Sequence, residues 1–484
     1  MFNKILEKYK GMSLPVKAAL WYTICNFLNK GIALLTMPIF TRLLTEEQYG
    51  IYSIYQSWTN ILIIFSSLNI FMSSYIKGLI KYKDDQENFT TSQIGLILMI
   101  TMLIGTICFF NINLVEKILN IPKLLIFGMF IELLSMPILE LWLARERFDY
   151  KYKSIIFVTI GLNILSILVS IITIVLTNYK IEAKVFSNAF IRFIFIMPLF
   201  YFFIKKSKKF FDWNYWKYAL VFNLPLIPHY LSNFVLTQSD RIMIGRYVGN
   251  SEAAFYSIAY TISTVLVLLI TATNNALTPY IYKSLEKKEI EGIKKNTNQI
   301  IIIMAVLVLI VMIFAPEIIY VFAGKNYMDA IYVIPPITAS VFFIYIYSLF
   351  SNVEYYYQRT FLIAMATSIC AVLNIVLNYF FINKFGYYAA GYTTLICYLF
   401  LSLFHFCAYK IVLRKEMPNV KNLYDIKLIV SISIFILVYM FFMLLTYRYI
   451  LLKYLLFIVI VIFAILFRKV IINVVKSSLK SNKE

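Results

Sequence analysis

Fourteen long apolar segments follow one another along this chain of 484 residues, and they restrict it to one class of fold. A helix needs about 20 apolar residues to cross the hydrocarbon core of a membrane. Since lipid offers no partners to backbone amides and carbonyls, each segment is expected to be an α-helix. The sequence therefore predicts an all-α polytopic membrane protein with about 14 transmembrane helices. The segments cover residues 16–40, 48–76, 93–112, 122–143, 154–177, 183–204, 217–239, 253–281, 298–323, 330–352, 361–382, 387–411, 426–447 and 450–472.

The composition excludes a soluble protein and argues against a catalytic domain outside the membrane. Hydrophobic residues make up 61% of the chain and charged residues 14%, with a mean hydropathy of +0.78. Soluble domains usually contain about 25% charged residues. The segments between the predicted helices are too short to hold an enzyme domain, so the protein is not expected to be an enzyme. The five cysteines all fall inside apolar segments, at spacings that match no metal site.

The net charge of +21 is distributed unevenly over the predicted connections. If the N-terminus is cytoplasmic, 32 of the 45 Lys and Arg residues lie on the cytoplasmic side and 11 on the outer side. This bias follows the positive-inside rule and predicts that both termini are cytoplasmic. The Lys-rich run at 205–209 is interpreted as a topology signal that contacts anionic lipids, and no nucleic-acid partner is expected. No small-residue cleavage site follows the first apolar segment, so that segment is expected to be a retained helix.

Two short patterns recur along the chain. Arg42 is followed ten residues later by Tyr52-Ser53-Ile54, and Arg246 is followed ten residues later by Tyr256-Ser257-Ile258. The second pattern is Leu-Asn-Ile, at 162–164 and again at 373–375. Together they match predicted helix 1 with helix 7 and helix 5 with helix 11.

A duplication of six helices keeps its orientation in the membrane, so the repeats are expected to be parallel. We expect an N-terminal six-helix lobe at 1–210 and a C-terminal six-helix lobe at 211–415. Helices 13 and 14 and a cytoplasmic tail would occupy 416–484.

Several stretches resemble the bacterial polysaccharide-repeat-unit flippases of the O-antigen and capsule type. This family belongs to the multidrug/oligosaccharidyl-lipid/polysaccharide exporter superfamily. The chain departs from the family pattern at Ala390-Gly391-Tyr392, where small residues in the order Gly-Ala-Ala are usual. The matching stretches are Ser239-Asp240-Arg241 with Gly245 and Gly249, Ala254 to Tyr260, Arg42 to Tyr52, Thr278-Pro279 with Tyr282-Lys283, Leu373-Asn374 with Asn378, and Phe385-Gly386 with Ala389 to Gly391.

The resemblance implies two six-helix lobes around a central cavity in the bacterial cytoplasmic (inner) membrane. It further implies a transporter that works by alternating access and moves polyprenyl-diphosphate-linked oligosaccharides from the inner to the outer leaflet. Membrane lipids are expected partners, as are a polysaccharide polymerase and chain-length proteins. No cofactor is expected beyond coupling to H⁺ or Na⁺.

Two cations, Lys30 and Arg192, lie deep inside predicted helices. A charge at the bilayer centre costs roughly 2.5–3.5 kcal/mol on insertion scales, so it usually faces protein or a watery cavity. Lys30 shares one helix face with polar residues such as Asn26, and both cations are predicted to bind an anionic substrate. The alternative for Lys30 is a structural pair with a carboxylate such as Glu132, or a side chain that extends to the interface. The alternative for Arg192 is a buried pair with Glu132 or Glu140.

Other polar residues are weaker candidates. Arg42, Arg241 and Arg246 lie near outer helix ends, where they either contact substrate or extend to the interface. Ion coupling is assigned to one or more of the titratable residues Glu132, Asp240, Glu354 and His229, without a choice among them.

Two other classes of function compete with this prediction. A drug/cation antiporter or a peptidoglycan-precursor flippase would share the superfamily. A membrane glycosyltransferase or repeat-unit polymerase would need a substantial outer loop with paired carboxylates, which this sequence lacks.

Overall fold

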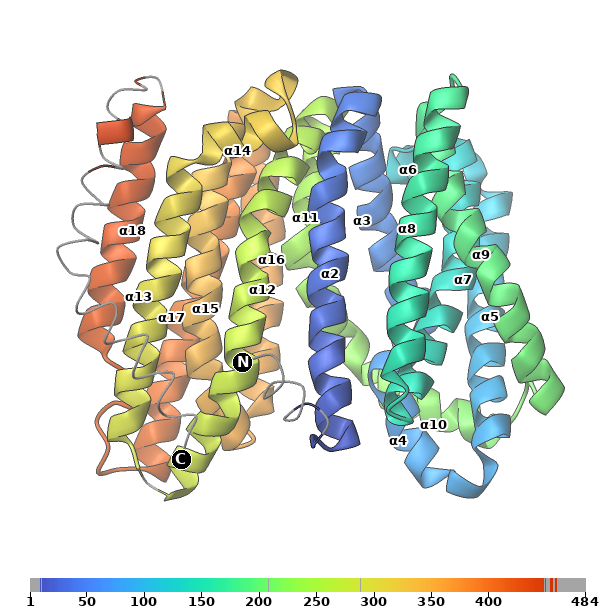
Figure 1. Ribbon diagram of the computed structural model, residues 1–484, viewed down its shortest axis with the longest axis horizontal. Helices are drawn as coiled ribbons and strands as arrows, with labels where there is room; N and C mark the ends of the chain where they lie inside the picture. Colours follow the sequence, from blue (N-terminus) through green and yellow to red (C-terminus); the bar gives the residue numbers. More distant parts are fainter. Residues whose placement is uncertain are drawn as a thin grey trace. The chain divides into compact units, whose positions relative to one another are not determined.

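The computed structural model describes residues 9, 11–207, 209–287, 289–447, 449, 453–455 and 458. All regular elements in these residues are α-helices or short 3-10 helices, which confirms the predicted all-α class. The chain divides into two compact units, Met1–Ala254 and Phe255–Glu484. Figure 1 shows the helices of both units.

The helices of the first unit are mostly long (Figure 1). They are α2 (Leu14–Leu43), α3 (Glu46–Ser67), α4 (Ser74–Lys81), α5 (Gln86–Phe110), α6 (Ile112–Leu119), α7 (Lys123–Phe148), α8 (Tyr152–Leu176), α9 (Lys180–Lys206), α10 (Trp213–Asn223) and α11 (Ile227–Tyr247).

The second unit begins within the first turns of α12. Its helices are α12 (Asn250–Lys287), α13 (Glu291–Ile313), α14 (Ala315–Phe322), α15 (Ile334–Tyr356), α16 (Thr360–Phe385), α17 (Tyr388–Glu416) and α18 (Ile426–Thr446).

Twelve helical stretches among the described residues are long and apolar enough to cross a membrane. Helix α3 is a further helix of 22 residues whose sequence is more polar than these twelve. The fourteenth predicted segment, 450–472, lies almost entirely outside the described residues.

Three predicted segments are interrupted, and turn chemistry explains the breaks. The segment 48–76 is not one helix: α3 ends at Ser67, and Leu68 and Asn69 adopt left-handed backbone angles with φ of 50° and 48°. The segment 298–323 divides into α13 and α14, and a proline occupies the first turn of α14, where its missing amide costs nothing. The segment 217–239 divides into α10 and α11, joined by the 3-10 turn Leu224–Leu226 that contains the first of its two prolines.

Helix α3 closely approaches α11 and the first residue of α12 in the first unit. A Cβ atom on Gly50 would lie 1.7 Å from the carbonyl oxygen of Asn250, and one on Gly245 would lie 2.2 Å from Cδ1 of Ile54. The Ser57 hydroxyl donates a hydrogen bond to the side chain of Gln238 at 3.1 Å. This contact therefore needs glycine at both positions.

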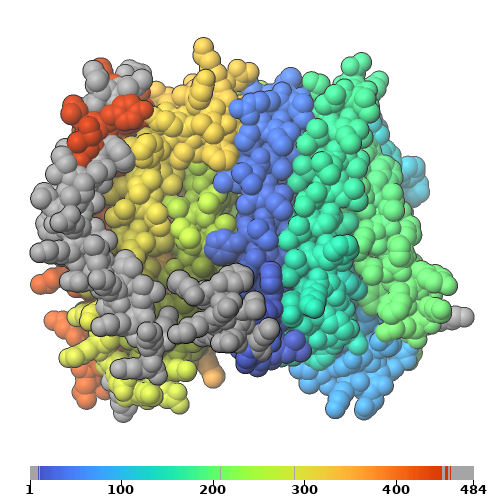
Figure 2. All heavy atoms as spheres, viewed as in Figure 1, coloured from blue at the N-terminus to red at the C-terminus, as the bar shows by residue number. Residues whose placement is uncertain are grey.

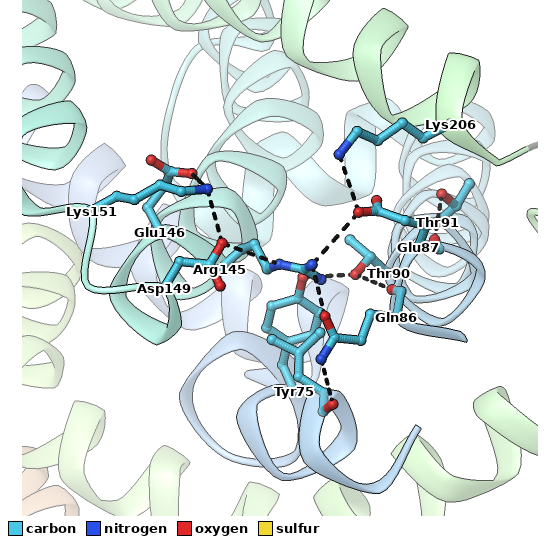
Figure 3. A network of polar contacts seen from close by, with 11 residues as sticks. Tyr75, Gln86, Glu87, Thr90, Thr91, Arg145, Glu146, Asp149, Lys151 and Lys206 are labelled. Atoms are coloured by element: carbon cyan, nitrogen blue, oxygen red, sulfur yellow. Dashed lines mark hydrogen bonds and ion pairs between the residues drawn. The ribbon is translucent and has the colours of Figure 1, made fainter. Parts of the chain in front are cut away.

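A network of charged side chains joins the helix ends at one end of the first unit (Figure 3). Arg145 near the end of α7 donates to the Gln86 side chain at 2.9 Å and lies 3.6 Å from the Glu87 carboxylate, both at the start of α5. Lys206, the last residue of α9, lies 3.2 Å from the same Glu87 carboxylate. Three helices of the unit are thus tied together at this end.

The loop before α8 extends this network. Lys151 lies 3.0 Å from Asp149 and 3.6 Å from Glu146. The hydrogen bond to Asp149 is the main reason why the pKa of Lys151 is raised above its usual value. Since 56% of the Lys151 side chain is exposed, solvent screens this pair strongly.

Helix α15 is the buried centre of the second unit, and it packs against α17 along much of its length. A Cβ atom on Gly391 would lie 3.0 Å from Cγ of Pro336, so this glycine allows α17 to approach the start of α15. The departure from the family pattern at Ala390-Gly391-Tyr392 is thus compatible with tight packing of α17.

Candidate functional site

Helix α2 presents one face to α8 and leaves the Lys30 face uncovered. On the packed face, the Cys25 sulfur lies 3.0 Å from the Thr159 hydroxyl, and Asn163 donates to Asn29 at 2.9 Å. On another face, the side chains of Asn26 and Lys30 are exposed. Figure 2 shows α2 and α8 side by side at the surface of the molecule.

Lys30 has no ion-pair partner among the residues that the structure describes. Glu132, the carboxylate that the sequence suggested as a structural partner for Lys30, is instead paired with Arg192. An exposed ammonium in the middle of a helix of membrane length is open to contact an anion.

Arg192 lies on α9 and pairs with Glu132 of α7. Its Nη1 atom lies 3.6 Å from Oε1 of the carboxylate, and the two side chains are 25% and 7% exposed. Glu140, the other proposed partner, instead lies 3.2 Å from Arg147. Arg192 thus forms the ion pair with Glu132 that was the alternative to a cavity contact, while a quarter of its side chain stays exposed.

Lys184, about one turn inside the start of α9, is a further cation that the protein buries within a helix of membrane length. Its side chain is buried, with 4% of its surface exposed. Its ammonium lies 3.4 Å from the centre of the Phe40 ring and 5.6 Å from the centre of the Tyr52 ring. Both distances fit cation–π contacts, which stabilise an ammonium that has left water.

The start of α9 explains why sequence reasoning missed Lys184. The predicted helix began at residue 183, which assigned Lys184 to the membrane interface, whereas α9 begins at Lys180. A signal was present: Lys184, Asn188 and Arg192 are spaced four apart, so they follow one stripe of a helix. Asn188 donates to the Tyr52 hydroxyl at 3.3 Å, which links this stripe to α3.

Lys30 and Arg192 lie at similar depths in the first unit. The contact between Phe40 and Lys184 places these residues of α2 and α9 at one level. Lys30 precedes Phe40 by ten residues, so about 15 Å of helical rise separates Lys30 from the level of this contact. Arg192 follows Lys184 by eight residues, so about 12 Å of rise separates Arg192 from the same level. Because α2 and α9 run in opposite directions, both displacements point the same way.

The remaining candidate arginines differ in burial. Arg42 is exposed and donates to the Pro38 carbonyl at 2.9 Å, and Arg246 is exposed. Arg241 is 7% exposed and donates to the Thr237 carbonyl at 2.6 Å and to the Gln238 side chain at 3.1 Å. Since Gln238 also binds Ser57 of α3, Arg241 belongs to the contact between α3 and α11.

The four ion-coupling candidates lie in different surroundings. Glu132 is bound to Arg192, and Asp240 is fully buried. The ring of His229 is half-buried and lies 3.3 Å from the side-chain nitrogen of Asn233. Glu354 is fully buried and lies 2.8 Å from Nδ1 of His405, a residue that sequence reasoning did not select.

No group of three or more His, Cys, Asp or Glu residues within the described ranges is placed to hold a metal ion.

Comparison with known proteins decides the family. The family model described as "Polysaccharide biosynthesis protein" matches residues 16–285, which is more than half of the chain. The chain belongs to this family. A second model, MatE, matches residues 225–380. The resemblance noted in the sequence is thereby confirmed.

A curated relative and two solved structures extend the comparison. "Lsg locus putative protein 1" of Haemophilus influenzae is 23% identical over 75% of this chain and 88% of its own length. The lipid II flippase MurJ, in an inward closed conformation, has a TM-score of 0.68 at 18% identity over 94% of this chain and 100% of its own. An inward-facing multidrug resistance MATE family transporter of the MOP superfamily has a TM-score of 0.59 at 14% identity over 82% of this chain and 96% of its own. At these identities, the two structures establish a shared fold.

Proposed function

We propose that this protein moves polyprenyl-diphosphate-linked oligosaccharide repeat units from the inner to the outer leaflet of the bacterial cytoplasmic membrane by alternating access. One observation carries the proposal: the first unit holds Lys30 and Arg192 deep inside helices of membrane length and Lys184 nearer the start of α9, while Glu132 is bound to Arg192. A charge at such depth is costly to insert, so Lys30 and Arg192 together favour an anionic cargo. The diphosphate is the anionic part of the proposed cargo, and ammonium and guanidinium groups are its usual partners.

The three cations would take different parts in binding. Lys30 is exposed and would meet the diphosphate first. Arg192 offers five N–H donors, and its contact with Glu132 through Nη1 at 3.6 Å leaves others for phosphate oxygens. Lys184 is enclosed by aromatic rings, so it would raise the positive potential without touching the cargo. The polyprenyl tail would remain in lipid, which requires a lateral opening.

Two alternatives within the superfamily are supported by specific matches. The MatE match over residues 225–380 supports a drug/cation antiporter as one alternative. The MurJ-like fold supports a peptidoglycan-precursor flippase as the other. An exporter of cationic drugs would need carboxylates without ion-pair partners near Lys30 and Arg192, so that the positively charged drug could bind there. Glu132 is instead bound to Arg192, which favours an anionic cargo over a drug cation.

The proposed location is the inner membrane, with both termini in the cytoplasm. A polysaccharide polymerase and chain-length proteins are the proposed partners. Reporter fusions at Lys209 and Glu289 are expected to report cytoplasm, and fusions at Lys180 and Lys325 the outside. An outside signal at Glu289 would contradict this topology.

Complementation tests the cargo directly. The chain is expressed in three bacterial strains, which lack an oligosaccharide repeat-unit flippase, the peptidoglycan-precursor flippase or the main multidrug exporters. Surface polysaccharide should return in the first strain, while the second stays inviable and the third stays drug-sensitive. Rescue of the second or third strain without the first would overturn the proposed cargo.

A further inference from the structure

The second unit contains a fully buried acid–base pair that the proposed cargo contacts do not use. Glu354 in the last turn of α15 and His405 in α17 both have 0% of their side-chain surface exposed, and Oε1 lies 2.8 Å from Nδ1. The outer atoms of the pair, Glu354 Oε2 and His405 Nε2, are also buried and have no hydrogen-bond partner among the described residues. The pair is thus enclosed in protein, with one polar atom left over on each side.

The packing around the pair is aromatic and holds it in place. The Tyr347 ring stacks on the imidazole, with 5.6 Å between ring centres and 23° between planes. Ser402, one turn before His405, donates to the Phe343 carbonyl of α15 at 2.9 Å. These contacts fix the register of α15 against α17 and therefore the distance between the acid and the base.

Charged side chains on the neighbouring helices are bound to other groups or exposed. Arg359 before α16 lies 2.8 Å from Glu416 at the end of α17, and Asp425 caps the first turn of α18 at 3.2 Å. On α17, Lys410 donates to the Lys421 carbonyl at 2.9 Å. The exposed charged residues at the helix starts are Glu291, Lys294 and Lys295 of α13 and Lys427 of α18.

The titratable neutral groups near the pair are also mostly engaged. The Tyr424 hydroxyl donates to the Leu349 carbonyl at 2.8 Å, the Tyr409 hydroxyl accepts from the Leu423 amide at 2.7 Å, and the Cys370 thiol donates to the Cys397 carbonyl at 3.1 Å. The Tyr345 phenol is also buried on α15. None of these groups supplies a charge that would balance a charged Glu354–His405 pair.

Charge balance then limits the pair to one exchangeable proton while it is enclosed. With that proton, the pair is neutral overall, as carboxylate and imidazolium or as carboxylic acid and imidazole. Losing the proton would leave a net negative charge, and gaining a second would leave a net positive charge, in a site that water does not reach. Either state carries the large penalty of an uncompensated buried charge.

We propose that Glu354 and His405 form an occluded proton-binding site that couples proton movement to transport. The site would hold one proton between Glu354 and His405 Nδ1 while α15 and α17 are packed as described. It would exchange that proton with water in the conformation that hydrates Glu354 Oε2 and His405 Nε2. The coupling role rests on the proposed function, whereas the proton site itself does not.

Nitrogen NMR tests the site without any substrate, because the chain contains only two histidines. Full-length protein labelled with ¹⁵N-histidine is studied in lipid nanodiscs, and His229→Gln leaves His405 as the single signal. From pH 5 to pH 9 we expect the His405 ring shifts to stay constant. A shift that titrates near the free-histidine value of about 6.5 would overturn the proton site.

A flux assay tests the coupling. Liposomes of phosphatidylethanolamine and phosphatidylglycerol that enclose a pH dye receive the full-length protein and a polyprenyl diphosphate disaccharide as probe. The wild type should move protons with the probe, and Glu354→Gln or His405→Gln should reduce that proton flux at least tenfold. Glu416→Gln, the same change at the exposed pair with Arg359, is the matched control and should behave as the wild type.

The outcomes separate the two proposals. Probe movement without proton movement in the wild type would overturn the coupling and leave the proposed function standing. No probe movement in the wild type would overturn the proposed function, and the NMR result would still decide the proton site.

Discussion

The two units each contain a buried acid paired with a base, and the pairs differ in the charge they can carry. In the first unit, Arg192 and Glu132 are 3.6 Å apart, and a quarter of the arginine side chain is exposed. In the second unit, Glu354 and His405 are 2.8 Å apart and fully enclosed. Guanidinium stays charged at any physiological pH, whereas imidazole and carboxyl groups exchange protons. The first pair therefore suits binding of an anion, and the second suits holding a proton.

The surroundings of the two pairs reinforce this difference. Lys30 and Lys184 add positive charge to helices of the unit that contains Arg192. Around Glu354, the described neighbours are aromatic or neutral, and the nearest charged side chains are paired or exposed at helix ends. The surroundings of the first pair thus include further fixed cations, whereas those of Glu354 and His405 are mainly aromatic or neutral.

The largest expected effect is the loss of export when Lys30 loses its charge. Lys30→Gln should reduce export at least tenfold, whereas Lys30→Arg should retain part of it, because phosphate accepts from either cation. Export is measured as surface polysaccharide in the complemented flippase-null strain, with immunoblots for abundance. Lys17→Gln, on the same helix, is the control. An equal loss of export in Lys30→Gln and Lys17→Gln would contradict a specific role of Lys30 in binding the cargo.

Arg192 should combine a role in export with a role in stability. Arg192→Gln leaves Glu132 buried without its partner, which costs about 3–5 kcal/mol for a fully buried pair, so abundance should fall. Adding Glu132→Gln should restore abundance but not export. Full export by that double variant, at normal abundance, would mean that Arg192 serves structure alone.

Lys184 should affect export more than folding. Lys184→Met keeps the length of the side chain and removes the ammonium, giving up a cation–π contact of about 0.5–2 kcal/mol but also the cost of burying the charge. We expect the thermal unfolding temperature to stay equal or to rise while export falls several-fold. A strongly destabilised variant would show that the ammonium holds α2, α3 and α9 together.

The exposed pairs of Figure 3 should contribute least. Lys151→Gln should cost at most about 1 kcal/mol of unfolding free energy, since exposed ion pairs are weak. Because the pKa of Lys151 is raised in the folded state, the contribution is fully present at neutral pH and is lost only as pH rises above about 10. Denaturant unfolding at pH 7 and pH 11 measures it. A loss between pH 6 and pH 8 would point to another group.

Sequence determined the fold class well, because length and hydropathy alone define a membrane helix. It failed where backbone turns interrupt an apolar run. Leu68 and Asn69, whose backbone angles are left-handed, lie between α3 and the next turn. The hydrophobicity of residues 48–76 does not predict this break. The repeat-based boundaries at 210 and 415 remain a prediction.

The candidate site could be predicted in part. Depth within an apolar segment identified Lys30 and Arg192, but it could not choose between a cavity contact and an ion pair for Arg192, since that depends on which face of α7 meets α9. Lys184 and His405 were missed because their environments come from neighbouring helices. Phe40 of α2 encloses Lys184, and Glu354 of α15 faces His405, contacts that only tertiary packing creates.

The most direct test of the account is the affinity of the full-length protein for undecaprenyl diphosphate compared with uncharged undecaprenol, measured by native mass spectrometry. The wild type should prefer the diphosphate at least tenfold, and the Lys30→Gln, Arg192→Gln double variant should lose that preference while it binds the alcohol as before. Glu354→Gln should leave the preference intact, because its pair is assigned to the proton and not to the cargo. A stable double variant that still prefers the diphosphate as strongly as the wild type would contradict the central claim.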